Sequence, residues 1–87
     1  MKIISKPIDA IVVFRCGNKP LPYKFRYREQ DSSDKEVYVG KIIYSQQQRI
    51  AGQTAYVYDC QSEIDGIQKR YQLKYLISDC RWELYKM

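Results

Sequence analysis

The chain has 87 residues, 45% of them hydrophobic, and a formal net charge of +5 with no histidine. A chain of this length fits one domain, which we expect to have modest stability because it buries only about 60–65% of its unfolded surface. The lack of histidine excludes Cys/His zinc sites and histidine-dependent nucleophilic catalysis, and the lack of a long apolar run predicts a cytoplasmic protein without a membrane span.

The first predicted strand covers residues 7–15, where branched apolar side chains occur at both parities. This pattern is typical of a strand that is buried on both faces. Residues 16–20 follow as a turn, because Gly17 and Asn18 adopt positive φ easily.

The second predicted strand, residues 21–30, alternates between aromatic and basic side chains. One face carries the aromatic set and the opposite face the cations: Tyr23, Phe25 and Tyr27 against Lys24, Arg26 and Arg28. A two-residue loop at 17–18 would form a hairpin with four cross-strand pairs: Ile8 with Tyr27, Asp9 with Arg26, Ala10 with Phe25, and Val12 with Tyr23.

A third strand and a short helix are predicted in the middle of the chain. A polar turn at residues 31–34 precedes a strand over 35–44, in which Gly40 indicates a bulge or a sharp bend. Ser45 with a glutamine three residues later has the spacing of a helix-capping box, and Gly52 suits the position after a helix end. We therefore expect one short helix near residues 46–51.

The strongest turn signal is Asp65-Gly66, which lies between two isoleucines. A type I′ hairpin turn needs positive φ at both central residues, and Asp-Gly supplies it. This turn pairs residues 56–64 with 67–77 and predicts an apolar and a polar face. The apolar pairs are Cys60–Tyr71, Tyr58–Leu73 and Tyr56–Tyr75, and the polar pairs are Glu63–Gln68, Gln61–Arg70 and Asp59–Gln72.

A second turn at Ser78-Asp79 predicts the same inward face for the central strand. Its pairs are Ile77–Cys80, Tyr75–Trp82 and Leu73–Leu84 on the apolar side, and Leu76–Arg81, Lys74–Glu83 and Gln72–Tyr85 on the polar side. A slip of one residue at either turn would bring lysine, arginine and glutamine into the core. The two turns therefore support one common register.

The three cysteines are Cys16, Cys60 and Cys80. In this register Cys60 and Cys80 share a face with the central strand between them, about 9.5 Å apart. That separation is too large for a disulfide. We therefore expect three reduced, buried thiols.

Together these elements predict an all-β fold in which residues 1–87 form a single β domain. We expect a six-stranded antiparallel meander that curls into a small barrel or a strongly bent sheet, with one short helix near residues 46–51. Closure of the sheet would cover its edge strands.

Two blocks of sequence carry a family resemblance. One is Pro22-Tyr-Lys-Phe-Arg-Tyr27, and the other runs through Tyr58-Asp-Cys-Gln-Ser62, Gly66 and Tyr71-Gln-Leu-Lys-Tyr75 to Cys80-Arg-Trp-Glu-Leu-Tyr85. They resemble a group of small, stand-alone bacterial all-β proteins of about this length, whose function is unassigned. The stretch Phe25-Arg26-Tyr27 is also faintly similar to the WYL-type sensor domain, a small β module of bacterial regulators. The Trp-Tyr-Leu signature itself is absent, so no ligand residue is carried over.

No pattern in the sequence proposes an enzyme, a cofactor or a metal site. All four glycines are explained by turns and bends, so no phosphate-binding loop remains. We expect a non-enzymatic binding or regulatory module whose partner is a protein. A homodimer through an edge strand or through a patch of exposed tyrosines (Tyr38, Tyr44, Tyr85) fits this composition, because tyrosine is enriched at binding hot spots.

The alternative is a nucleic-acid-binding small β barrel, which would use Lys24, Arg26, Arg28, Arg70 and Lys74. Such barrels combine basic grooves with stacking aromatic rings. In the predicted strand 21–30 the rings and the cations point to opposite faces. This arrangement places the rings in the core, so we favour the protein-binding function.

Overall fold

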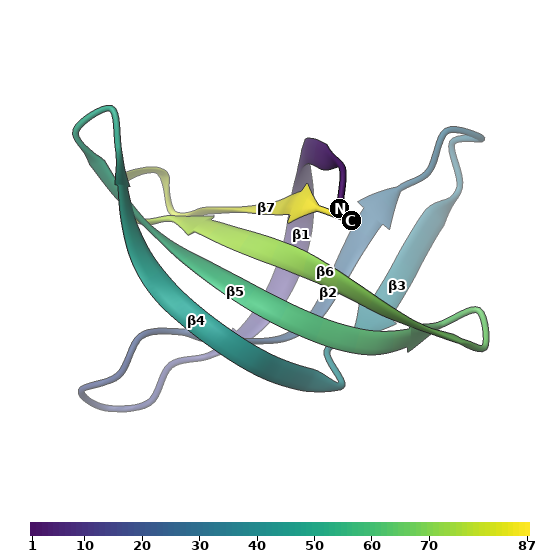
Figure 1. Ribbon diagram of the computed structural model, residues 1–87, viewed down its shortest axis with the longest axis horizontal. Coiled ribbons are helices and arrows are strands. Elements are labelled where there is room, and N and C mark those ends of the chain that lie inside the picture. Colours follow the sequence, from purple (N-terminus) through teal and green to yellow (C-terminus); the bar gives the residue numbers. More distant parts are fainter.

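The computed structural model describes residues 1–87, apart from the side chain of residue 50. One antiparallel sheet of seven strands curls into a half-barrel (Figure 1). The strands are β1 (Ile3–Val13), β2 (Leu21–Arg28), β3 (Asp34–Tyr38), β4 (Lys41–Ile50), β5 (Gln53–Ile64), β6 (Ile67–Leu76) and β7 (Arg81–Lys86), with a 3-10 turn, η1 (Ile77–Asp79), before β7. The all-β prediction is confirmed, whereas the prediction of six strands and a short helix is wrong.

The strand order is β3-β2-β1-β7-β6-β5-β4, so the first and last strands of the chain pair with each other. Ile8 of β1 lies opposite Trp82 of β7. A simple meander would instead keep β3 beside β4. In the structure these two consecutive strands form the opposite edges of the sheet.

A bend at Val39-Gly40 separates β3 from β4 and divides the strand predicted over 35–44. The Val39 N–H donates to the Tyr23 carbonyl at 2.9 Å, and the Gly40 N–H donates to Ser62 Oγ at 3.0 Å. A Cβ on residue 40 would lie 3.0 Å from the Gln61 carbonyl oxygen. Glycine is thus required here by the close approach of two backbones.

The predicted helix at 46–51 is instead the second half of β4 and its turn. Ala51 and Gly52 have φ of 51° and 80° and form the turn of the β4–β5 hairpin. A helix of one or two turns is marginal in water. The long ladder with β5 supplies this segment with hydrogen bonds in place of helical ones, so tertiary pairing prevails over the capping signal.

The register of β5, β6 and β7 follows the sequence closely. All six pairs predicted from the Asp65-Gly66 turn are present, and both turn residues have positive φ (53° and 78°). The β6–β7 pairs Tyr75–Trp82, Leu73–Leu84, Lys74–Glu83 and Leu76–Arg81 are also confirmed.

The turn before β7 is longer than predicted. The 3-10 turn Ile77–Asp79 is followed by Cys80 at φ 50°, so the predicted Ile77–Cys80 pair is absent from the ladder. A bulge after Gln72 also places Gln72 opposite Lys86, whereas Tyr85 was predicted. The longer loop preserves the parity, which is why the apolar face is unaffected.

The β1–β2 hairpin contains a bulge that the alternation did not predict. Asp9–Arg26 and Ala10–Phe25 pair as expected, but Val12 lies opposite Pro22. Tyr23 is the extra residue at this bulge, and its side chain is exposed. β1 is half-buried on one face only: Ile8, Ala10 and Val12 are half-buried, whereas Asp9, Ile11 and Val13 on its outer side are exposed.

The core fills the concave side of the curl. Its buried members come from β2, β3, β5, β6 and β7: Phe25, Val37, Tyr58, Cys60, Ile64, Tyr71, Leu73, Trp82 and Leu84. The Trp82 ring lies 4.9 Å from Tyr75 and 5.4 Å from Tyr58 between centroids. The buried hydroxyls are satisfied: Tyr58 donates to the Pro20 carbonyl, and Tyr71 shares a hydrogen bond of 2.6 Å with Ser62 Oγ.

All three cysteines are free, as expected, and Cys60 is buried. The expectation of three buried thiols is wrong for Cys16 and Cys80, which are exposed. Both lie in the loops that flank the strands, outside the faces that the alternation describes.

We expect Gly66→Val to lower the free energy of unfolding by about 1–3 kcal/mol. A β-branched residue strongly disfavours the φ of +78°, while a Cβ at this position would meet no atom within 4 Å. Backbone strain alone therefore causes the loss. Gly66→Asn is the control and should lose much less, since asparagine tolerates positive φ. Urea titration measures both, and a Gly66→Val midpoint equal to wild type would contradict this turn.

The buried phenol of Tyr71 makes stability depend on alkaline pH. Burial raises the pKa of Tyr71 from 10.0 to about 12. Below pH 10 the phenol is protonated in both the folded and the unfolded state. Between pH 10 and about 12 only the unfolded state ionises, so the free energy of unfolding falls as the pH rises.

Tyr71→Phe should therefore lower the free energy of unfolding at pH 8 and make it less dependent on pH between 10 and 12. At pH 8 it loses the bond to Ser62 and about 0.5–1.5 kcal/mol of stability. From pH 10 to 12 its stability should fall less steeply than that of wild type. Tyr44→Phe, at an exposed position, should match wild type throughout. Urea midpoints across this range measure the slopes, and equal slopes for Tyr71→Phe and wild type would refute the assignment.

Candidate protein-binding face

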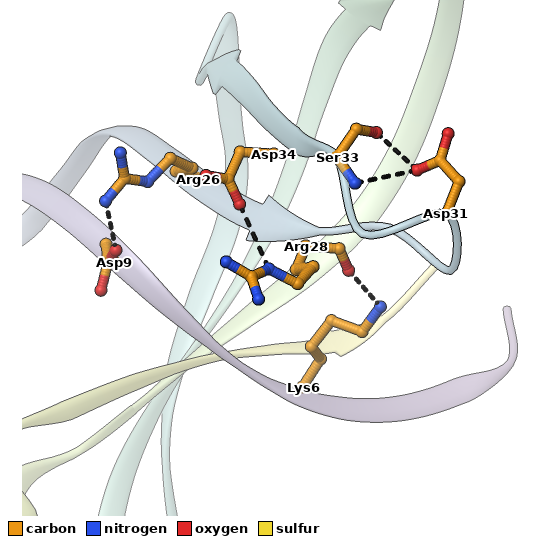
Figure 2. A network of polar contacts seen from close by, with 7 residues as sticks. All are labelled: Lys6, Asp9, Arg26, Arg28, Asp31, Ser33 and Asp34. Atoms are coloured by element: carbon orange, nitrogen blue, oxygen red, sulfur yellow. Dashed lines mark hydrogen bonds and ion pairs between the residues drawn. The ribbon is translucent and has the colours of Figure 1, made fainter.

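The outer face of β1, β2 and β3 carries the three predicted cations of β2, and each lies beside a carboxylate. The antiparallel register places acids of β1 and β3 next to the basic residues of β2. The shortest nitrogen–oxygen distances are 2.9 Å for Lys24–Glu36, 2.8 Å for Arg26–Asp9 and 3.5 Å for Arg28–Asp34. Figure 2 shows the two arginine pairs. We call this set of six residues the charged row.

The charged row is close to neutral as a unit. The hydrogen bond with Glu36 raises the pKa of Lys24, and the same bond lowers the pKa of Glu36. The bond with Asp9 likewise raises the pKa of Arg26. Because these groups face water, the pairs add little to the stability of the fold. They fix the positions of charges of both signs on this face.

The β2–β3 turn closes one end of this face. The Asp31 carboxylate accepts hydrogen bonds from the Ser33 N–H and hydroxyl at 3.0 and 2.6 Å, and Lys6 donates to the Arg28 carbonyl at 2.7 Å (Figure 2). The bonds from Ser33 lower the pKa of Asp31. These contacts connect β1 and the β2–β3 turn at the polar end of the face.

The other two predicted cations lie elsewhere on the sheet. β1 and β7 separate β2 from β6, which carries Arg70 and Lys74. Lys74 is only 9% exposed and its Nζ lies 3.8 Å from the centre of the Tyr85 ring, a cation–π contact. Arg70 is exposed opposite Gln61. The structure therefore brings three of the five cations together and leaves two apart.

The other end of the β1–β2–β3 face is apolar. We call its exposed hydrophobic residues the apolar end: Ile11 (59% exposed), Val13 (43%), Tyr23 (54%) and Tyr38 (60%). Ile11, Lys24 and Tyr38 lie in one row across the three strands. The Tyr23 and Tyr38 rings meet edge to face at 5.8 Å, and Lys24 Nζ lies 4.7 Å from the Tyr38 ring centre.

A shallow hollow of about 250 Å³ lies where the charged row meets the apolar end. Its lining residues are Asp9, Ala10, Ile11, Lys24, Phe25, Arg26 and Glu36. The hollow thus has apolar walls and ionised groups of both signs.

Sequence reasoning located the cations but missed the apolar end. Tyr23 was assigned to the core because it alternates with Phe25 and Tyr27, and Ile11 and Val13 because both faces of their strand appeared buried. Pro22 was the available signal, since proline within a strand often marks a bulge. Of the three tyrosines expected at the surface, Tyr38 and Tyr44 are exposed and Tyr85 is half-buried.

Aromatic rings and arginine beside mixed surface charges are the composition of a protein interface. Such interfaces have an apolar centre, a polar rim, and hot spots rich in tyrosine and arginine. Within the described side chains, no cluster of three or more His, Cys, Asp or Glu residues could hold a metal ion. The described residues also include no helix long and apolar enough to span a membrane.

Comparison of the chain with protein-family models, with curated proteins and with solved structures finds no match. The resemblance to small bacterial all-β proteins and to WYL-type domains therefore stays a prediction. The face formed by β1, β2 and β3 is the basis on which a function can be proposed.

Proposed function

We propose that this protein is a non-enzymatic binding module that recognises another protein through the outer face of β1, β2 and β3. The observation that carries the proposal is the apolar end. Four large hydrophobic side chains lie exposed near one end of three strands in a protein of 87 residues. Exposed apolar patches bounded by polar residues are characteristic of interaction sites.

The apolar end supplies part of the free energy that binding needs. Covering one fully exposed large hydrophobic side chain contributes about 1.5–3 kcal/mol. Ile11, Tyr23 and Tyr38 are each a little over half exposed, so covering all three would contribute roughly 3–5 kcal/mol before the costs of association. Micromolar binding needs about 8 kcal/mol net of those costs. A partner must therefore bury further surface around the apolar end to reach that range.

The charged row gives this face orientation and selectivity. Its ion pairs are exposed, so their exchange for groups of a partner costs little. Charges of alternating sign disfavour partners whose charges do not match them. We therefore expect a partner with its own mixed charges around an apolar centre.

Nucleic-acid binding remains the second candidate, and one observation favours it. The exposed Tyr23 and Tyr38 rings lie on the same side as Lys24, where bases could stack on them. Against it, Lys24, Arg26 and Arg28 each lie within 3.5 Å of a carboxylate. A nucleic acid bound here would have to compete with three local anions.

The protein-binding proposal predicts a discrete covalent adduct from the apolar end. A photo-crosslinking amino acid at position 38, in cells that naturally contain the protein, should give one adduct of defined mass. The same group at exposed Gln68 on β6 is the control and should give none. Ile11→Ser, in the same row of the sheet as position 38, should abolish the adduct. Equal, diffuse labelling from both positions would contradict the proposal.

If the protein bound nucleic acid, its affinity would be tight and would depend on salt. We expect instead that mixed single-stranded DNA and RNA bind no tighter than about 10⁻⁴ to 10⁻⁶ M at physiological salt, the non-specific range. Fluorescence anisotropy at about 50 and 200 mM salt measures this. Sub-micromolar binding at the higher salt, lost in the double variant Arg26→Glu/Arg28→Glu, would establish the nucleic-acid function instead.

A further inference from the structure

The two free edges of the sheet differ in how they are protected from pairing. β3 is short, and three of its five residues are charged: Asp34, Lys35 and Glu36. β4 has ten residues, and residues 42–48 between Lys41 and Arg49 carry no charge and no proline. Natural edge strands are usually protected by charges, proline, bulges or short length. β3 has two of these protections, whereas residues 44–48 of β4, beyond the bulge at Ile43, have none.

The backbone of β4 is available along its outer edge. β4 is hydrogen-bonded to β5 alone, and after one bulge at Ile42/Tyr44 the ladder continues unbroken from Tyr44 to Arg49. In the part of β4 that the structure describes in full, residues 41–49, no backbone hydrogen bond falls outside this ladder. Alternate residues of an antiparallel edge direct both N–H and C=O outward. In Figure 1 β4 forms the free lower margin of the curl.

We propose that β4 pairs with β4 of a second copy, antiparallel and across a two-fold axis near Gln46. The pairing would extend one sheet through both copies. This pairing uses only the edge of the sheet, so it does not depend on the protein-binding face proposed above.

The sequence of β4 is self-complementary under this symmetry. A two-fold axis at Gln46 sets Gln46 opposite itself, Tyr44 opposite Gln48, and Ser45 opposite Gln47. A glutamine amide both donates and accepts, so two identical side chains can bond to each other. The two cations of β4 are not set opposite each other: Arg49 lies opposite Ile43, and Lys41 opposite Ala51, so no like charges are directly paired.

A second copy of the chain therefore fits this edge without conflict. Two identical lysines or glutamates at the axis would repel each other, whereas glutamine does not. Side chains also keep their faces, because Tyr44, Gln46 and Gln48 all point to the outer side of the sheet.

The dimer would leave the protein-binding face free. β3 and β4 are opposite edges of the sheet, so pairing through β4 does not cover β1, β2 or β3. Each dimer would then present two apolar ends. Two linked sites can raise the overall affinity for a repetitive or dimeric target by about 10²–10⁴-fold.

Opposite charges at the axis test the pairing directly. Gln46 is exposed, so Gln46→Lys and Gln46→Glu should both fold. We expect each variant alone to self-associate about fivefold more weakly than wild type, and their equal mixture to form a heterodimer about fivefold more tightly. Sedimentation velocity over a concentration series at low salt, where screening is weak, measures the three constants. Exposed Gln30, in the β2–β3 turn, provides the control pair Gln30→Lys and Gln30→Glu, which should behave as wild type.

Two results would overturn the proposal. One is a wild-type chain that stays monomeric up to millimolar concentration. The other is a dimer whose dissociation constant is the same for wild type, for both Gln46 variants and for their mixture. Neither result affects the adduct expected from position 38, so the dimer proposal can be refuted while the protein-binding proposal stands.

Discussion

The pairing of β1 with β7 is the contact on which the rest of the structure depends. It joins the three strands β1–β3 to the four strands β4–β7, through pairs such as Lys6–Leu84 and Ile8–Trp82. Sheets of three or four strands need a covered hydrophobic face to be stable. Trp82 lies at this contact and packs on Tyr58 and Tyr75, so the ladder and the aromatic core stabilise each other. The pairing is also the most distant in sequence, which predicts slow folding.

The same contact determines which surfaces are left for binding. Because the first and last strands meet in the centre of the sheet, β3 and β4 become its edges although they are consecutive in the chain. The bend at Gly40, held by Ser62, allows the chain to pass from one edge to the other. The outer side of β1, β2 and β3 is uncovered, which leaves Ile11 and Tyr38 in water. The proposed face and the proposed dimer edge both follow from this arrangement.

Turns and strand pairings that depend on residues close together in the chain are predicted well from the sequence. The Asp65-Gly66 turn and the alternation around it give the correct partners for Tyr58, Tyr71 and Leu73, because turn chemistry and parity are local. Pairing between β1 and β7 has no turn to encode it, so the sequence implies it only if the predicted meander closes into a barrel. The glutamine run has a local helix signal that pairing with β5 overrides. In the candidate site, Arg26 was placed on the correct face, but the exposure of Tyr23 depends on a bulge set by β1.

The account depends on an open sheet with β1 beside β7 and with β3 apart from β4. Nuclear Overhauser effects between backbone protons measure both features in one NMR experiment. We expect cross-strand effects between Ile8 and Trp82, and none between residues 34–38 and 42–48. Effects between β3 and β4, as in a closed barrel or a meander, would contradict the strand order and with it both proposed binding surfaces.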